Sequence, residues 1–148
     1  MGRMAIAVLV LLSWPSAAWA GTTPLANPPP TAAAPRRIIL SLSSGSPTKM
    51  NAVFNNIDNI RQFYGKDRVR IELVAYGDGV TAFVRDGSPV RARVDAAKTD
   101  GVRLVACRIS LAAHDRGVAD LISGVEWVPS GLPEIVEREL AGWVYLRP

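Results

Sequence analysis

The sequence predicts the α/β fold class, with a parallel sheet and helices packed on it. Five short apolar segments with strand character recur along residues 37–148, and most are separated by segments long enough for a helix. Strands joined in this way pair in parallel, because an antiparallel hairpin needs only a short turn. The chain is 49% apolar and 20% charged, which is typical of a globular domain and excludes a disordered or coiled-coil chain.

The first strand is expected at residues 38–42, and residues 43–46 end it just before Pro47, a residue favoured at the first position of a helix. Apolar residues spaced three and four apart predict a helix up to Tyr64, with Gly65 as its C-terminal cap. Its apolar side consists of Met50, Val53, Phe54, Ile57, Ile60 and Tyr64.

The middle of the chain predicts two further strands. Residues 69–76 (VRIELVAY) form a strand that ends in the turn Gly77-Asp78-Gly79, and residues 80–84 and 90–98 are helical around a break at Gly87-Ser88-Pro89. The third strand comprises residues 102–106, and Cys107 follows it directly, before a short helix at 108–114.

The C-terminal part completes the sheet. Residues 125–128 form a fourth strand that stops at Pro129-Ser130-Gly131. Residues 133–140 form a helix with Ile135, Val136 and Leu140 directed inward, and residues 143–146 (WVYL) form the fifth strand.

One edge of this sheet is expected to hold the functional site, because open parallel sheets bind ligands at the carboxyl ends of their strands. The residues that the first four strands deliver to that edge are Ser44, Gly77, Asp78, Cys107, Arg108 and Ser130.

The first 20 residues have the pattern of a cleavable signal peptide. Arg3 precedes an apolar run at residues 5–12, and Ala18-Trp19-Ala20 is a small-residue cleavage motif. The run is about half the roughly 20 apolar residues that a spanning helix needs, so we expect no stable membrane insertion after cleavage. The predicted location is the periplasm or the secreted fraction. Residues 21–36 are predicted to be a Pro/Ala-rich linker, and residues 37–148 a single domain.

Composition excludes several classes of site. A single cysteine excludes an intrachain disulfide and a multi-cysteine metal site, and a single histidine argues against a histidine-rich one, so we expect neither a metal nor a cofactor. Removal of Arg3 leaves 16 basic against 13 acidic side chains, a net charge of +3. The basic residues are scattered and not interleaved with aromatic residues, so we expect no nucleic-acid partner.

Cys107 carries the most chemical information. It lies between a buried strand and the start of a helix, where the partial positive charge of the helix and the neighbouring Arg108 favour a thiolate. The alternative is a small buried hydrophobic residue, which is the commoner fate of a lone cysteine. Both interpretations remain open from the residues alone.

The other candidates have plain structural explanations. His114 is too far along a helix from Cys107 for a hydrogen bond, and we expect it on the surface. Asp78, between two glycines, is explained by a turn, and a role as a general base is the less favoured interpretation. The segment 43–49 (SSGSPTK) could hold an anion, but it lacks nucleotide-loop spacing, and helix capping by Ser46 and Pro47 explains it equally well.

Taken together, four stretches resemble the DsrE-like (DsrE/DsrF) sulfur-relay family, in its secreted branch. They are NNIDNIRQFYG, VRIELVAYGDGV, LVAC and, most specifically, GVEWVPSGLPEIVERELAGWVYLRP. The resemblance covers nearly the whole domain. It implies three αβα layers around a five-stranded parallel sheet of order 4-3-2-1-5, and assembly into trimers or hexamers.

In cytoplasmic members of that family a cysteine carries sulfur as a persulfide, and by position it matches Cys107. The chain departs from those members in its export signal and in Arg108, where a small or polar residue is expected. The resemblance implies at most a sulfurtransferase-like carrier, with unknown sulfur donor and acceptor. The alternative is a non-enzymatic oligomeric module that binds a small molecule or a protein and buries Cys107 in its core.

Overall fold

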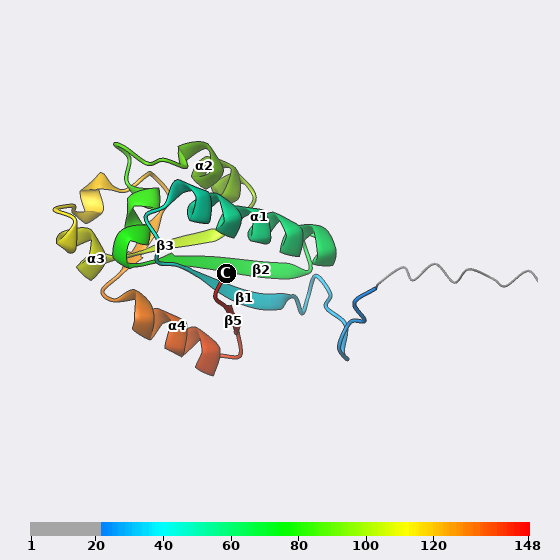
Figure 1. Ribbon diagram of the computed structural model, residues 1–148. Helices are drawn as coiled ribbons and strands as arrows, with labels where there is room; N and C mark the ends of the chain where they lie inside the picture. The colour runs from blue at the N-terminus through cyan, green and yellow to red at the C-terminus, as the bar shows by residue number, and fades with distance from the viewer. Residues whose placement is uncertain (1–21) are drawn as a thin grey trace, which may run out of the picture.

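The computed structural model describes residues 22–148, so the predicted signal peptide at residues 1–20 lies outside the described residues. The described chain forms a five-stranded, all-parallel sheet in the order β4-β3-β2-β1-β5, which confirms the predicted fold class and strand order (Figure 1). The strands are β1 (Arg36–Leu42), β2 (Val69–Ala75), β3 (Arg103–Cys107), β4 (Glu126–Val128) and β5 (Val144–Leu146). The helices are α1 (Pro47–Tyr64), η1 (Gly77–Phe83), α2 (Arg91–Thr99), α3 (Arg108–Ala113), η2 (Val118–Asp120) and α4 (Gly131–Leu140), where η denotes a 3₁₀-helix.

The two faces of the sheet are covered unequally. Helices α1 and α2 lie on one face and α4 lies on the other (Figure 1). Because side chains of a strand alternate between faces, Leu40 joins the large apolar cluster under α1, whereas Ile39 joins a small cluster under α4. That small cluster has only four buried members, which are Ile39, Val74, Val105 and Ile135.

Helix α1 has the bounds that its apolar spacing predicts, and it buries Met50, Val53, Phe54 and Ile57. Gly65 ends it with a positive φ of 86° and donates its N–H to the Arg61 carbonyl oxygen. Ser46 is the N-cap residue and Pro47 opens the helix, as predicted, but Ser46 makes no capping hydrogen bond through its side chain. Ser46 instead donates its backbone N–H to Ser44 Oγ at 3.2 Å.

The segment after β2 is helical earlier than its pattern predicts. The expected turn Gly77-Asp78-Gly79 is the first part of the 3₁₀-helix η1, and Thr81 Oγ1 donates to the Asp78 carbonyl oxygen at 2.7 Å. Gly79 is required here because a Cβ at this position would collide with the Leu42 backbone carbonyl. The close approach places the start of η1 directly against the end of β1.

Helix α4 corrects the predicted inward face of residues 133–140. Ile135 is buried as predicted, but Val136 is 51% exposed and Leu140 is 78% exposed. The side facing the sheet is formed by positions 131, 134, 135 and 138, the i, i+3, i+4, i+7 spacing of one helix face, and Glu134 and Arg138 contribute to it through ion pairs. Apolar character therefore did not identify the buried side of this helix.

Residues 22–35 form no helix or strand. The Arg36 guanidinium donates hydrogen bonds to the carbonyl oxygens of Ala26 at 2.7 Å and Pro28 at 2.9 Å, which ties part of this segment to β1. Within residues 22–148, no helix has both the length and the apolar character needed to cross a membrane.

Candidate functional site

Cys107 is the last residue of β3 and immediately precedes α3. It lies at the carboxyl edge of the sheet, as its sequence position predicts. However, only 5% of the residue is exposed, so the accessible edge position expected from the sequence is not found in the single chain.

The polar surroundings of the Cys107 thiol favour its ionised form. Burial alone raises the pKa of the thiol. Hydrogen bonds from the Ser110 hydroxyl and from the backbone N–H groups of Ser110, Gly131 and Ile109 outweigh burial, so the thiol pKa lies below its ordinary value. The thiolate is the form that attacks sulfur donors.

Two helices supply these donors. Ile109 and Ser110 belong to α3, which continues the chain after Cys107, whereas Gly131 is the first residue of α4. A Cβ built on Gly131 would lie 3.3 Å from Cys107 Cβ and 3.1 Å from Val74 Cγ1. A Cβ at this position would make unusually tight contacts, so glycine favours the close approach of the α4 backbone to the cysteine.

Of the predicted edge residues, Gly77 and Asp78 are joined to α3. The Gly77 N–H donates to Ser110 Oγ at 2.8 Å, so Gly77 contacts the residue that hydrogen-bonds Cys107. Asp78 Oδ1 lies 3.2 Å from His114 Nε2, which places His114 in a contact between α3 and η1 and leaves it half-buried. Neither Asp78 nor His114 is among the groups that hydrogen-bond the sulfur.

The remaining predicted residues are not among the groups that hydrogen-bond the sulfur. Arg108 is exposed, and its guanidinium carbon lies 5.8 Å from the centre of the Trp127 ring. Ser130 precedes α4 without capping it through its side chain. Ser44 lies beyond the end of β1, two strands away from β3 in the sheet, and is not brought to Cys107.

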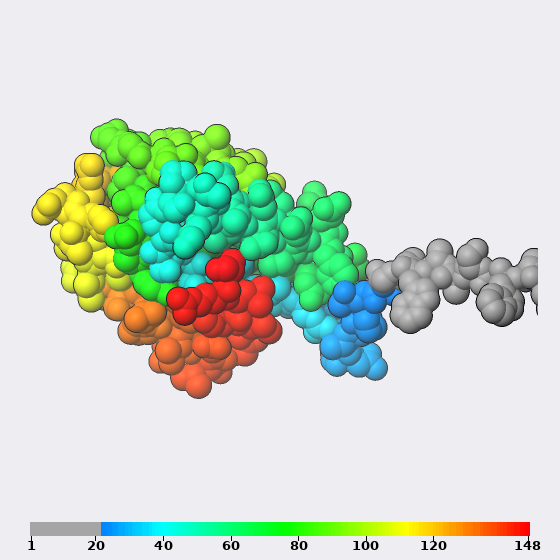
Figure 2. Space-filling model, in the orientation of Figure 1, coloured from blue at the N-terminus to red at the C-terminus, as the bar shows by residue number. Residues whose placement is uncertain are grey.

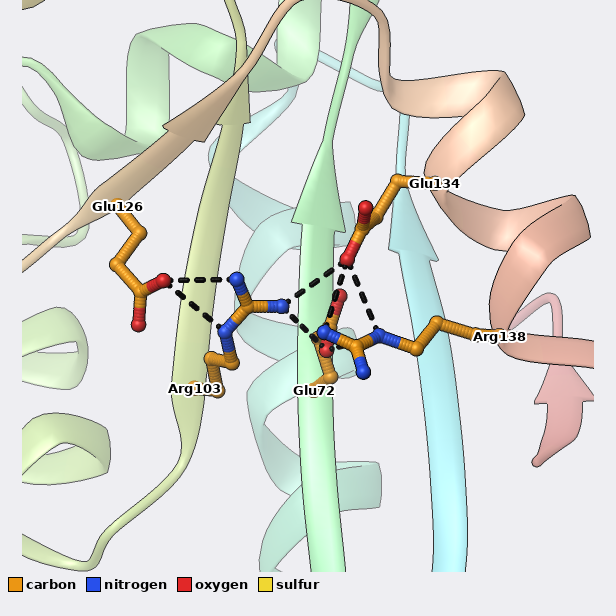
Figure 3. Close-up of polar contacts among 5 residues, drawn as sticks. All are labelled: Glu72, Arg103, Glu126, Glu134 and Arg138. Carbon is orange, nitrogen blue, oxygen red and sulfur yellow. Dashed lines mark hydrogen bonds and ion pairs between the residues drawn. The ribbon is translucent and has the colours of Figure 1, made fainter. Parts of the chain in front are cut away.

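Five charged residues form a cluster on the α4 face of the sheet (Figure 3). Arg103, on the strand that ends at Cys107, contacts Glu72 Oε2 at 2.8 Å, Glu134 Oε1 at 3.0 Å and Glu126 Oε2 at 2.7 Å. Arg138 contacts Glu72 Oε2 at 2.9 Å and Glu134 Oε1 at 3.0 Å. We call this set, Glu72, Arg103, Glu126, Glu134 and Arg138, the ion cluster.

Glu72 is the fully buried member of the ion cluster. Burial raises the pKa of its carboxyl group, and the adjacent Arg103 and Arg138 oppose that shift without cancelling it. Its Oε1 has no hydrogen-bond partner. The sequence carried a signal for this cluster, because a glutamate inside the apolar strand VRIELVA requires a partner when the strand is buried on both faces.

A separate crevice of about 350 Å³ lies between the ends of β1 and β5 and the start of α1. Figure 2 shows the C-terminal residues beside α1 on this side of the molecule. Lys49 and Arg147 supply positive charge, and Ser43 and Ser44 supply hydroxyl groups. Strand placement reverses beside β1, which is where open sheets form ligand crevices. In residues 22–148 no group of three or more His, Cys, Asp or Glu is placed to hold a metal ion.

Comparison with known proteins places this geometry in a family. The model of the DsrE/DsrF-like family matches residues 36–148, the whole of the sheet and its helices. The chain belongs to the DsrE/DsrF-like family. The resemblance found in the sequence is thereby confirmed at the level of the family.

Two solved structures share the fold of this DsrE/DsrF-like chain. MTH1491 of Methanobacterium thermoautotrophicum, a protein of unknown function, is 34% identical with a TM-score of 0.72, and the match covers 76% of this chain and 99% of that one. The ychN protein of E. coli is 19% identical with a TM-score of 0.61, and the match covers 77% and 99% of the two chains. No curated protein matches the chain.

Sequence reasoning missed three parts of the site. Ser110 lies three residues after Cys107, a spacing that brings both side chains to one helix side and was a usable signal. The Gly131 N–H comes from a segment 24 positions away in the chain, and its approach depends on how α4 packs. Arg103 was part of a predicted strand, but nothing local indicated its three carboxylate partners.

Proposed function

We propose that this DsrE/DsrF-like protein is a sulfur carrier that holds a persulfide on Cys107. The family suggests a role of the sulfur-relay type. The observation that carries the proposal is the set of donors around the sulfur, because hydrogen bonds from Ser110, Ile109 and Gly131 lower the thiol pKa despite burial. A cysteine with only a packing role requires no such donors.

The proposed transfer conserves oxidation state overall. The Cys107 thiolate attacks the outer sulfur of a donor persulfide or polysulfide, a sulfur–sulfur bond forms to Cys107, and the donor leaves as a thiolate. An acceptor thiolate then attacks the outer sulfur, and Cys107 is released as a thiolate. Cys107 is the only cysteine of the chain, so the acceptor thiol belongs to another molecule.

Sulfur loading tests this proposal. Folded protein is incubated with inorganic polysulfide and weighed intact, and we expect the mass of one or more sulfur atoms, removable by a thiol reductant. The Cys107→Ser variant is the control and should gain none. Loading that requires prior unfolding, or that occurs equally in the variant, would refute the carrier role.

A ligand-binding module is the second candidate function. The crevice beside Ser44 favours it, because a cavity of about 350 Å³ with Lys49 and Arg147 at its wall suits a small organic anion. In that case Cys107 is a core residue, and alkylation with iodoacetamide proceeds only after unfolding. Slow but measurable alkylation of folded protein, with no unfolding detected by circular dichroism, excludes this role for Cys107.

Export remains a proposal that rests on residues 1–20. Cleavage after Ala20 would place the carrier in the periplasm or outside the cell, where its donors and acceptors must also lie. N-terminal sequencing of the mature protein should read Gly21-Thr22-Thr23. An intact Met1 would contradict export by this route.

A further inference from the structure

Helix α4 contacts strand β3 at two points. At the carboxyl end, Gly131 packs against Cys107, with its Cβ position 3.3 Å from Cys107 Cβ. One helical turn later, Glu134 accepts a hydrogen bond of 3.0 Å from Arg103. The strand that carries the cysteine and the helix that covers it are thus fastened together twice.

Apolar packing contributes little to this attachment. Ile135 is the one large apolar side chain that α4 buries against the sheet, and Leu132, Val136 and Leu140 are all exposed. Besides the packing of Gly131 and Ile135, α4 contacts the sheet through ion pairs, from Glu134 to Arg103 and from Arg138 to Glu72 (Figure 3). The segment just before α4 is held by the pairing of Val128 with Cys107 and by the hydrogen bond from the Ile109 N–H to the Pro129 carbonyl oxygen. Beyond the first residue of α4, the ion cluster supplies the directional contacts that hold the helix to the sheet.

The geometry of the ion cluster is suited to hold α4 in one position relative to the sheet, in addition to attracting it by charge. The Arg103 guanidinium bridges carboxylates from three other elements, Glu72 on β2, Glu126 on β4 and Glu134 on α4. A planar guanidinium with several fixed donors specifies direction as well as charge, which an ammonium group does not. Glu72 is fully buried, so its own pairs with Arg103 and Arg138 are shielded from the screening that weakens surface pairs.

We infer that the ion cluster positions the Gly131 amide on the Cys107 sulfur, and that Arg103 and Glu134 are positioning residues for this thiol. The inference rests on the proposed function only in taking Cys107 as the reacting group. Loss of the cluster lets α4 shift, and the thiolate then loses the donor that α4 supplies. The consequence is a weaker acid at Cys107 in a protein that is still folded.

The first test conserves charge. In Arg103→Lys the positive charge stays on β3, but the lysine cannot bridge three carboxylates in one plane. We expect the midpoint of the pH profile for iodoacetamide alkylation of folded protein to rise by about half a pH unit, as for loss of one helix-terminal contact to a charge. An unchanged midpoint overturns the inference.

The second test separates position from charge. Glu134→Gln removes a negative charge from the helix that covers Cys107, which by direct electrostatics can only lower the thiol pKa, whereas the loss of position raises it. We expect a rise. The matched control is Glu137→Gln, on the exposed side of the same helix, and it should leave the midpoint unchanged. A fall in Glu134→Gln, or an equal shift in both variants, refutes positioning by the cluster.

A third measurement follows Gly131 in the wild-type chain and does not depend on the folding of the ion-cluster variants. The backbone ¹⁵N–¹H signal of Gly131 should titrate with the same midpoint as Cys107 and should lose this titration in Cys107→Ser. A Gly131 signal that does not follow the thiol refutes the contact on which the inference depends. Sulfur loading is measured separately, so wild-type protein that passes these tests but takes up no sulfur refutes the proposed function and not the inference.

Discussion

The Ser110 hydroxyl oxygen accepts a 2.8 Å hydrogen bond from the backbone N–H of Gly77. A serine hydroxyl has one proton, and the Gly77 amide occupies its oxygen as an acceptor, so the proton is free to be donated to Cys107. Ser110 thus joins the turn after β2 to the thiol at the end of β3. The contact explains why a cysteine that is 5% exposed still has a lowered thiol pKa.

Substitution of Ser110 tests this arrangement. Ser110→Ala should raise the thiol pKa by about one pH unit, the worth of one hydrogen bond to an ionised group. The measurement is the pH dependence of alkylation in folded protein. Ser130→Ala is the matched control, because Ser130 makes no side-chain capping bond at the start of α4, and its profile should superimpose on that of wild type. Equal profiles for both variants would contradict a role for Ser110.

The buried carboxyl of Glu72 predicts a pH-dependent stability. Its folded-state pKa is raised, mainly by burial, so the stability it contributes is present below the ordinary glutamate pKa and is lost as pH rises through the folded value. Glu72→Gln cannot ionise and avoids that loss. We therefore expect the free energy of unfolding of Glu72→Gln to increase relative to that of wild type as pH increases from about 4 to about 7, measured by urea denaturation.

The comparison for Glu72 is Glu139→Gln on the exposed side of α4, where the difference from wild type should stay flat over the same pH range. If the free energy of unfolding of Glu72→Gln instead decreases relative to that of wild type as pH increases, the ionised carboxylate is the form that the folded state favours. The two arginines would then outweigh burial, contrary to our assignment.

Gly79 predicts a large loss of stability on a small substitution. In Gly79→Ala the added Cβ meets the Leu42 carbonyl, which is backbone at the end of a buried strand and cannot move aside. We expect a loss of about 3 kcal/mol, the upper range for overpacking. In Gly117→Ala the nearest side-chain atom is Asp120 Oδ2 at 3.9 Å, so this control should change stability by no more than about 0.5 kcal/mol. A tolerated Gly79→Ala would show that η1 can separate from β1.

The sequence predicted the parts of this fold in which hydrophobicity and burial agree. In α1 the apolar spacing and the Pro47 and Gly65 signals point the same way, and the helix has the expected bounds. In α4 hydrophobicity and burial disagree, because Glu134 and Arg138 face the sheet through ion pairs and Val136 faces outward. A pattern of apolar residues cannot reveal that a charged pair is buried until its partners on other strands are known.

The candidate site could also be predicted only in part. The position of Cys107 at the carboxyl edge of the sheet was predictable, because the residue stands at the end of a parallel strand. The contact of Asp78 with His114 and the donor from Gly131 join segments far apart in the chain, and their contact depends on packing. The strand order came from the family resemblance, and the structure confirms it.

The outward side of α4 predicts self-association. Leu132, Val136 and Leu140 recur every four residues and are 57%, 51% and 78% exposed, so they form one apolar stripe along the helix. Soluble monomers seldom leave such a stripe uncovered, and homo-oligomers with closed symmetry are the common way to cover it. We expect light scattering to report a trimer or hexamer at micromolar concentration.

Val136→Lys places a charge in the middle of the stripe and should yield a folded monomer, since its side chain contributes nothing to the core. Val118→Lys, which adds the same charge to an exposed apolar position on η2, should keep the wild-type mass. A monomeric wild-type protein would refute self-association, and a Val136→Lys oligomer of unchanged mass would move the interface away from α4.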